Sequence, residues 1–131
     1  MNGTTDVFVH NRKTGKTERV SVHSNGDESD QWSGLPSISG KGRIVAFMSY
    51  ATNLVEGDTN GEHDVFVHDR ETGKTERVSI RSNGDEGDHA SVEPSISGKG
   101  RHVAFMSVAT NLVNNDTNGT SDVFQRRVVE R

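Results

Sequence analysis

The stretch "DVFVH" at residues 6–10 decides the fold, because the chain repeats it at a fixed interval. It recurs at residues 64–68, and an altered copy, "DVFQR", stands at residues 122–126, so that each step is 58 residues. Aligned without a gap, the first two copies of this 58-residue unit are identical at 43 positions. A repeat of this length and fidelity indicates an array of supersecondary units that bury their faces on one another.

The boundaries of the units follow from this alignment. We interpret the chain as a single repeat domain over residues 1–131, with repeat 1 at 6–63, repeat 2 at 64–121 and a partial third copy at 122–131. The hydrophobic fraction is only 29%, with five Phe, one Trp and one Tyr, while Gly occurs 14 times. Such a chain suits a thin, turn-rich all-β architecture better than a large globular core.

Composition also excludes several classes of partner. The net charge of −4 provides no basic field for a nucleic-acid backbone, and no apolar run approaches the length that spans a membrane. The N-terminus "MNGTTDVF" has no signal-peptide apolar region. We therefore expect no nucleic-acid partner and no membrane partner. The absence of cysteine excludes disulfides and thiolate metal sites, and it fits either side of a membrane.

Each unit contains four short runs that are typical of strands. They are "PSIS" (36–39), "RIVAFMS" (43–49), "DVFVHDR" (64–70) and "TERVSI" (75–80). We place Pro36, and Pro94 in repeat 2, at the first residue of a strand, where a missing N–H is tolerated. The Gly turns "SGKG" and "ETGK" separate β-branched and aromatic runs, which predicts antiparallel hairpins. No segment has a 3.6-residue apolar period, so we expect little helix.

The connections predict where ligands bind. In a four-stranded antiparallel sheet the first and third connections lie at one end, and here they are the short pair. The two long, acidic connections therefore share the opposite end. Because loops on a rigid scaffold carry function, we expect the binding surface there.

The run "PSISGKGRIVAFMS" with "ATNLVEGDTNGEHDVFVHDRETGKTERVS" resembles the blade of TolB-like, WD-repeat-like β-propellers, over essentially the whole chain. The resemblance implies an all-β propeller of four-stranded antiparallel blades, with "PSIS" and "VAFMS" as inner strands and the other two as outer strands. Lys41 and Lys99 stand where the family commonly carries Asp. The resemblance also implies an extracytoplasmic bacterial setting. It does not decide function, since propellers serve as enzymes, lectins, partner platforms and scaffolds.

A chain of about two blades cannot close a ring alone, because single-chain propellers need four to eight. If each end face holds roughly 500 Å² of apolar area, its exposure forfeits about 12 kcal/mol. Either the chain is a piece of a longer propeller, or identical chains close a ring head to tail. The initial Met and the divergent last copy favour the ring. We expect a cyclic homo-oligomer of three to five chains, with three or four favoured.

The register of that ring stays open at the sequence level. The N-terminal outer pair would complete the blade that a neighbouring chain begins. Residues 6–10 and 122–126 then compete for one strand position, and either can complete the blade.

Two loops fit a calcium-binding pattern. "EGDTNGEHD" (56–64) and "NNDTNGTSD" (114–122) carry oxygen-bearing side chains at alternate positions, with Gly at the bend. The alternative is that the same sequence pattern forms an Asx-rich turn without a metal. The predicted metal ligands are Glu56, Asp58, Asn60, Glu62 and Asp64 in the first loop and Asn114, Asp116, Asn118, Thr120 and Asp122 in the second, with Glu62 and Thr120 contributing their main-chain carbonyls. Ca²⁺ is the one cofactor that the sequence suggests.

The other candidate ligand-binding residues also lie in the long connections. Asp30 and its repeat equivalent Asp88 belong to acidic loops that would make the long-loop end negative. Trp32 and Tyr50 occur only in the first copy and suggest a sugar or peptide platform, or a cover for a blade edge. The six histidines are scattered, and no catalytic motif is present.

We therefore interpret the protein as a non-enzymatic, self-assembling propeller scaffold or binding module with an acidic, calcium-binding long-loop face. The first alternative is a lectin-like propeller that binds carbohydrate or peptide through Trp32 and Tyr50. The second is an engineered or fragment propeller without a native ligand.

Overall fold

The computed structural model of the chain describes residues 5–55, 63–79, 91–107, 112 and 122–127, and its regular elements are all β-strands. Nowhere in these ranges is there a helix of the length and apolarity needed to cross a membrane.

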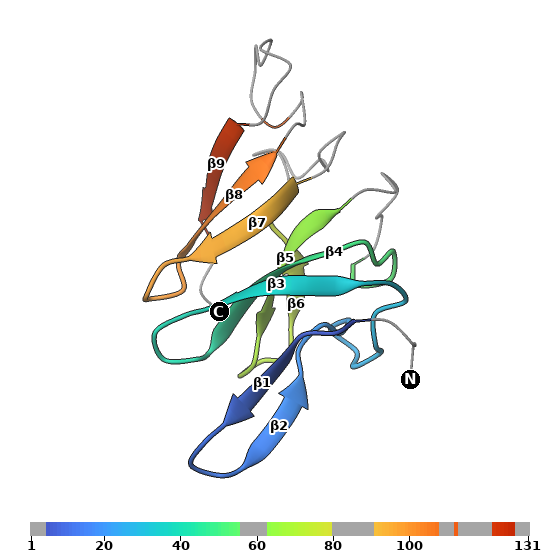
Figure 1. Cartoon of the computed structure of the whole chain (residues 1–131), viewed down its shortest axis with the longest axis vertical. Coiled ribbons are helices and arrows are strands. Elements are labelled where there is room, and N and C mark those ends of the chain that lie inside the picture. Colours follow the sequence, from blue (N-terminus) through green and yellow to red (C-terminus); the bar gives the residue numbers. More distant parts are fainter. Residues whose placement is uncertain (1–4, 56–62, 80–90, 108–111, 113–121, 128–131) are drawn as a thin grey trace.

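The strands form three antiparallel sheets, which follow one another along the molecule (Figure 1). We name them the hairpin sheet, the middle sheet and the last sheet. The hairpin sheet has β1 (Phe8–Asn11) and β2 (Lys16–Arg19). The middle sheet has β3 (Ser33–Ile38), β4 (Ile44–Ser49), β5 (Asp64–Asp69) and β6 (Thr75–Arg77). The last sheet has β7 (Ser91–Ile96), β8 (His102–Ser107) and β9 (Asp122–Arg127).

The middle sheet has the strand order β3-β4-β5-β6, in which each strand pairs with its neighbour in sequence. Its register aligns Ser33 with Ser49 and Ser49 with Asp64, so these three residues lie at one end of the sheet. We call this the long-loop end, because both long connections of the unit start from it. The turns 39–43, 70–74 and 97–101 lie at the other end, the short-turn end.

The prediction for the prolines is wrong. β3 begins three residues before Pro36, and β7 begins three residues before Pro94. Both strands contain a register shift at this point, and the residues before the prolines, Leu35 and Glu93, have φ values of 49° and 54°. The extra residue of a bulge is left out of the ladder, so a proline beside it needs no N–H partner. The strand therefore continues through the proline.

One hydrophobic core lies between the hairpin sheet and the middle sheet. Val7 and Val20 from the hairpin side pack against Val45, Phe47 and Phe66 of the middle sheet. The rings of Phe47 and Phe66 stack with centroids 5.8 Å apart. Alternate residues of β4 and β5 point to this side, as the two-residue period of a strand requires.

The remaining alternate residues of the middle sheet form a second core with the last sheet. Ala46, Val65 and Val67 pack there with Val103 and Phe105. The main chains also meet, because the amide of Gly40 donates a 2.8 Å hydrogen bond to the carbonyl of Gly98. A Cβ on Gly40 would lie 3.0 Å from that carbonyl oxygen, a tight contact, so this junction favours glycine.

The two outward faces of the array lack such cover. Phe66 is 0% exposed inside the array, whereas its repeat equivalent Phe8, on the outward face of the hairpin sheet, is 54% exposed. Val65 is 0% exposed, whereas its equivalent Val123, on the outward face of the last sheet, is 77% exposed. The same residue types are thus buried where a neighbouring sheet exists and exposed where none is described.

Candidate functional site

Three aromatic side chains meet at the long-loop end. The ring of His63 lies 3.8 Å from that of Tyr50 and 5.7 Å, edge-on, from that of Trp32, measured between centroids. Tyr50 is 38% exposed and Trp32 is partly exposed. We call these residues the aromatic cluster. Trp32 and Tyr50 were predicted from the sequence, whereas His63 was not, because its contact depends on how the connections fold.

Gly34 makes room for the aromatic cluster. A Cβ at this position would lie 2.6 Å from Cζ2 of Trp32. Repeat 2 carries Ala90 and Val92 at the two equivalent positions, so the large ring and the absent side chain occur together in repeat 1 only. The tryptophan therefore fills space that a valine side chain would occupy.

This exchange predicts the outcome of a substitution. Gly34→Val should lower the free energy of unfolding by about 1–3 kcal/mol through overpacking and should shift the tryptophan fluorescence, since Trp32 is the one tryptophan. Adding Trp32→Ala, which recreates the residues of repeat 2, should restore most of the stability in urea unfolding. A double variant no more stable than Gly34→Val alone would contradict the packing described.

Asp30, predicted as a ligand residue, ties two connections together. Its carboxylate accepts hydrogen bonds from the amide of Thr52 at 2.9 Å and from the hydroxyl of Thr52 at 2.5 Å. The amide of Asp30 donates to Oδ1 of Asn53 at 3.0 Å. Asp30 therefore fixes the connection before Trp32 to the connection after Tyr50, next to the aromatic cluster. Its equivalent, Asp88, lies outside the described residues.

Most of the predicted calcium ligands also lie outside the described part of the chain. Residues 56–62 and 113–121 and the side chain of Asp122 lie outside it, which leaves Asp64. In the described ranges no group of three His, Cys, Asp or Glu side chains could hold a metal ion. Calcium binding therefore stays a prediction.

Asp64 joins the start of β5 to the segment after β6. Its Oδ1 accepts a 3.0 Å hydrogen bond from the hydroxyl of Ser79, which accepts one from the amide of Val65. Its Oδ2 lies 3.8 Å from Nη1 of Arg77. The carboxylate is 0% exposed and the Arg77 side chain 9%. A buried charge pair with hydrogen bonds of this kind ties the two outer strands together.

Repeat 1 contains the same arrangement. The hydroxyl of Ser21 donates to Oδ1 of Asp6 at 3.0 Å, and Nε of Arg19 lies 3.8 Å from Oδ2. The spacing of Asp, Arg and Ser in "DVFVH…ERVS" is therefore a structural signal of the outer strand pair.

His68 forms a second tie of the outer strands. Its Nδ1 lies 2.8 Å from Oγ1 of Thr75, whose hydroxyl donates to the carbonyl of Val22 at 2.5 Å. Because the single hydroxyl proton goes to that carbonyl, Nδ1 of His68 must donate. Burial lowers the pKa of His68 below its ordinary value of 6.5 and outweighs the carboxylates of Glu18 and Asp69, which raise it.

The lowered pKa predicts a loss of stability in mild acid. The unfolded chain takes up a proton at this histidine near pH 6.5, whereas the folded chain takes it up only at lower pH. The unfolded state therefore binds more protons between these two values, so the free energy of unfolding should fall as the pH drops through this window. His68→Gln should reduce the slope, measured by urea unfolding at a series of pH values.

His10 is the matched control, since its Nδ1 lies 2.6 Å from Oγ1 of Thr17 in an exposed setting. An equal change of slope in His10→Gln and His68→Gln would contradict the role of burial.

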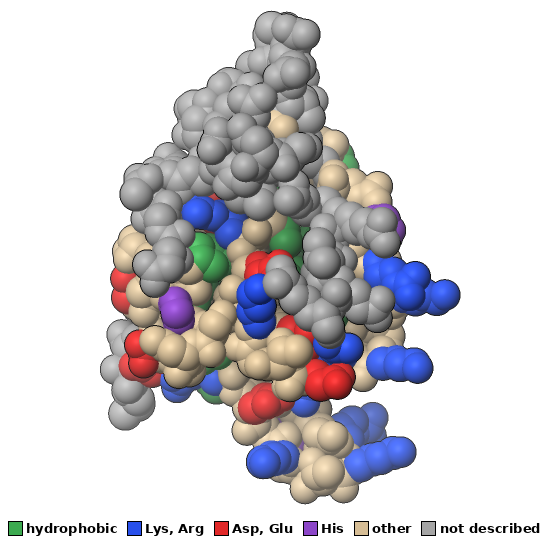
Figure 2. All heavy atoms as spheres, turned by 180° about the vertical axis from the view of Figure 1, so that it is seen from behind, with side chains coloured by type: hydrophobic (Ala, Val, Ile, Leu, Met, Phe, Trp, Pro, Cys, Tyr) green, Lys and Arg blue, Asp and Glu red, His purple; other side chains and the backbone are tan. Residues whose placement is uncertain are grey.

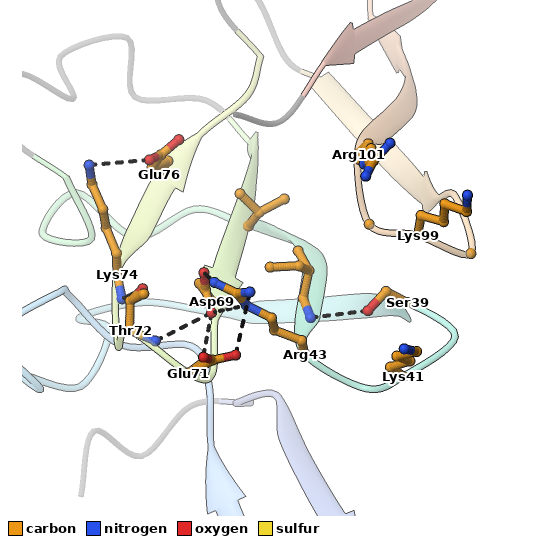
Figure 3. A pocket seen from close by; sticks show the side chains of 14 residues that line it. Ser39, Lys41, Arg43, Asp69, Glu71, Thr72, Lys74, Glu76, Lys99 and Arg101 are labelled. Atoms are coloured by element: carbon orange, nitrogen blue, oxygen red, sulfur yellow. Dashed lines mark hydrogen bonds and ion pairs between the residues drawn. The ribbon is translucent and has the colours of Figure 1, made fainter. Parts of the chain in front are cut away.

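A groove of about 590 Å³ opens at the short-turn end, between the middle sheet and the last sheet (Figure 3). Lys41 projects from the β3–β4 turn, and Lys99 and Arg101 project from the β7–β8 turn. Glu71 and Glu76, from the β5–β6 hairpin and β6, line another part. The groove is therefore polar, with cationic groups on the inner turns and carboxylates on the outer hairpin.

Several of these charges neutralise one another. Arg43 donates to both carboxylate oxygens of Asp69, at 3.0 and 2.9 Å, and approaches Glu71 at 3.4 Å. Burial alone would raise the pKa of Asp69, but the hydrogen bonds from Arg43 and from two backbone amides hold it below its ordinary value of 3.8. Lys74 pairs with Glu76 at 3.3 Å.

In Figure 2 basic side chains gather along the right-hand side of the molecule, where the β3–β4 and β7–β8 turns lie, and also at its foot. The sequence predicted a binding surface at the long-loop end, whereas this groove lies at the opposite end and was not predicted. The repeated "SGKGR" turn, which carries Lys41 and Lys99, was the available signal.

No protein-family model matches the chain, and no curated protein matches it. Among solved structures, the chain is similar to TolB from Acinetobacter baumannii, with a TM-score of 0.50 and 15% identity over 92% of the chain. It is also similar to a putative TolB from Agrobacterium tumefaciens, with a TM-score of 0.55 and 16% identity over 92% of the chain. The chain spans 23% and 36% of the length of these two structures. The resemblance first identified from the repeated blade motif is thereby confirmed for the fold: this chain folds as a segment of a TolB-like β-propeller.

Proposed function

We propose that this chain is a non-enzymatic binding and scaffold module that assembles head to tail with further copies of itself. The observation that carries the proposal is the contrast in exposure between repeat equivalents. Phe66 and Val65 are fully buried, whereas Phe8 and Val123 are 54% and 77% exposed on the two outward faces. The likeness to TolB propellers supports both a non-enzymatic role and an extracytoplasmic setting.

The interior of the chain supports the geometry of assembly. The outward face of the last sheet is equivalent to the middle-sheet face that the last sheet covers. The outward face of the hairpin sheet is equivalent to the middle-sheet face that the hairpin sheet covers. Each outward face therefore fits a face that a second copy presents, and such a contact is heterologous and able to close into a ring.

The test is the concentration dependence of thermal unfolding, because an assembly that binds only folded chains raises Tm with protein concentration. Phe8→Asp and Ala104→Asp each place a charge on one outward face, and each should abolish this dependence. Gln31→Asp, at an exposed position of the long-loop end, is the matched control and should retain it. A wild-type Tm that does not change with concentration would refute the proposal.

We further propose that the two "DTNG" loops bind Ca²⁺ at the long-loop end. The sequence pattern supports this. At a calcium concentration of about 100 Kd, linkage should raise the free energy of unfolding by about 2.7 kcal/mol, and a chelator should remove the gain. Asp58→Asn combined with Asp116→Asn should cancel the response in thermal melts. A chelator-insensitive wild type would assign these loops to Asx turns.

A second candidate function is lectin-like binding of carbohydrate or peptide. The partly exposed aromatic cluster of Trp32, Tyr50 and His63 specifically favours it, since stacked aromatic side chains offer flat apolar faces. A glycan array tests it. The absence of any hit, or hits that Trp32→Ala leaves unchanged, would remove this candidate.

A further inference from the structure

An arginine clasp closes the junction between the hairpin sheet and the middle sheet at the short-turn end. Arg70, in the β5–β6 turn, forms an ion pair with Glu18 of β2. Its Nη1 also donates a 2.6 Å hydrogen bond to the carbonyl of Gly42 in the β3–β4 turn. The Arg70 guanidinium therefore links the β5–β6 turn of the middle sheet to the β3–β4 turn of the same sheet and to β2 of the hairpin sheet.

The junction between the middle sheet and the last sheet offers the same acceptors. Glu76 is the repeat equivalent of Glu18, and Gly100 is the equivalent of Gly42. Both line the 590 Å³ groove. The position equivalent to Arg70 in the third copy is 128, which is a valine. The repeat position that carries Arg70 at the first junction therefore offers no arginine at the second.

The hairpin sheet carries the arginine that fits. Residues 6–21 and 64–79 differ only at positions 11 and 13, and Arg12 stands where the second copy has Arg70. Arg12 is exposed, and it forms no hydrogen bond or ion pair with any described residue. Glu76 pairs with Lys74 at 3.3 Å, so an incoming guanidinium would share this carboxylate with Lys74.

We propose that the hairpin sheet of a second copy occupies the outer half of the last sheet, in place of β9, and inserts Arg12 into the groove. There the guanidinium pairs with Glu76 and donates to the carbonyl of Gly100. This register rests on the proposed self-association and specifies it: each chain then contributes two complete four-stranded units to the assembly. The groove at the short-turn end is half of an intermolecular site, which the partner copy completes.

The sequence of β9 supports its replacement. Asp69, the acceptor for Arg43 in the middle sheet, is matched by an arginine at position 127. Val67, which is 3% exposed, is matched by the exposed Gln125. The hairpin of a second copy offers Asn11 and Val9 at these positions, which are a hydrogen-bond acceptor and an apolar side chain, as in the middle sheet.

Charge exchange tests this register. Arg12→Glu and Glu76→Arg should each weaken self-association about tenfold or more, because each places like charges together in the groove. The combined variant Arg12→Glu/Glu76→Arg should return association to near the wild-type value. Sedimentation velocity over a concentration series measures all four proteins. Arg70→Glu is the matched control, since its clasp is internal and its loss should change the stability of the chain more than its association.

Cross-linking supplies a second measurement, since the chain has no cysteine of its own. A short bismaleimide should join Arg12→Cys chains to Glu76→Cys chains when the two are mixed. Glu18→Cys and Arg70→Cys should cross-link when placed in one chain and should not cross-link when carried on separate chains.

The outcomes separate this inference from the function on which it rests. Chains that associate while Arg12→Glu leaves the affinity unchanged, and that give no Arg12–Glu76 cross-link, would overturn the register and leave the self-association standing. A wild type that stays monomeric would overturn both.

Discussion

Phe66→Ala should lower the free energy of unfolding by about 3–5 kcal/mol, a large part of the stability of a small domain. Phe66 is fully buried and its ring stacks on Phe47 in the core between the hairpin sheet and the middle sheet. Truncation would remove this contact and leave a cavity that a thin array cannot collapse to fill. Urea unfolding followed by far-UV circular dichroism measures the loss.

Phe8→Ala is the matched control, because the residue has the same position in the repeat and is 54% exposed. It should change the stability of dilute chain by less than about 1 kcal/mol, since a surface substitution rarely does more. It should nevertheless weaken self-association, because Phe8 lies on an outward face. Equal stability losses in Phe66→Ala and Phe8→Ala would contradict the burial on which the account depends.

Asp64→Ala should cost about 3–5 kcal/mol, because it removes one partner of a buried ion pair. It also removes the acceptor for the Ser79 hydroxyl. The experiment is urea unfolding in the presence of a chelator, so that no metal contributes. Adding Arg77→Leu should recover part of the loss, since an apolar side chain in place of the guanidinium leaves no buried charge without its partner.

Asp6→Ala is the corresponding control in repeat 1. Its partner Arg19 has a side chain that is 31% exposed, so solvent screens the charge that is left behind. The loss should be clearly smaller than for Asp64→Ala. Identical losses would mean that burial of the arginine does not decide the effect.

The strands were predictable because the repeat aligns every element with a second copy of itself. The runs at 43–49 and 64–70 contain β4 and β5, and the turns "SGKG" and "ETGK" lie where the register places them. The bulges were not predictable, since a proline rule alone reads Pro36 as a strand start. The αL conformation of Leu35 became visible only in the backbone.

The candidate sites divide in the same way. Trp32 and Tyr50 were identified from their occurrence in one copy only, whereas the contribution of His63 depends on a contact between two connections. The groove at the short-turn end was missed because it is formed by three turns from two different sheets. The role of Glu76 and Gly100 is found by comparing their junction with the one that Arg70 closes. This comparison needs the three-dimensional structure of both junctions.

The measurement that tests the central claim most directly is the solution mass of the wild-type chain by light scattering over a range of concentrations. We expect a mass that is a whole-number multiple, greater than one, of the 14.3 kDa of a single chain, and a Tm that rises with concentration. A cooperatively folded particle of 14.3 kDa, with a Tm independent of concentration, would contradict it.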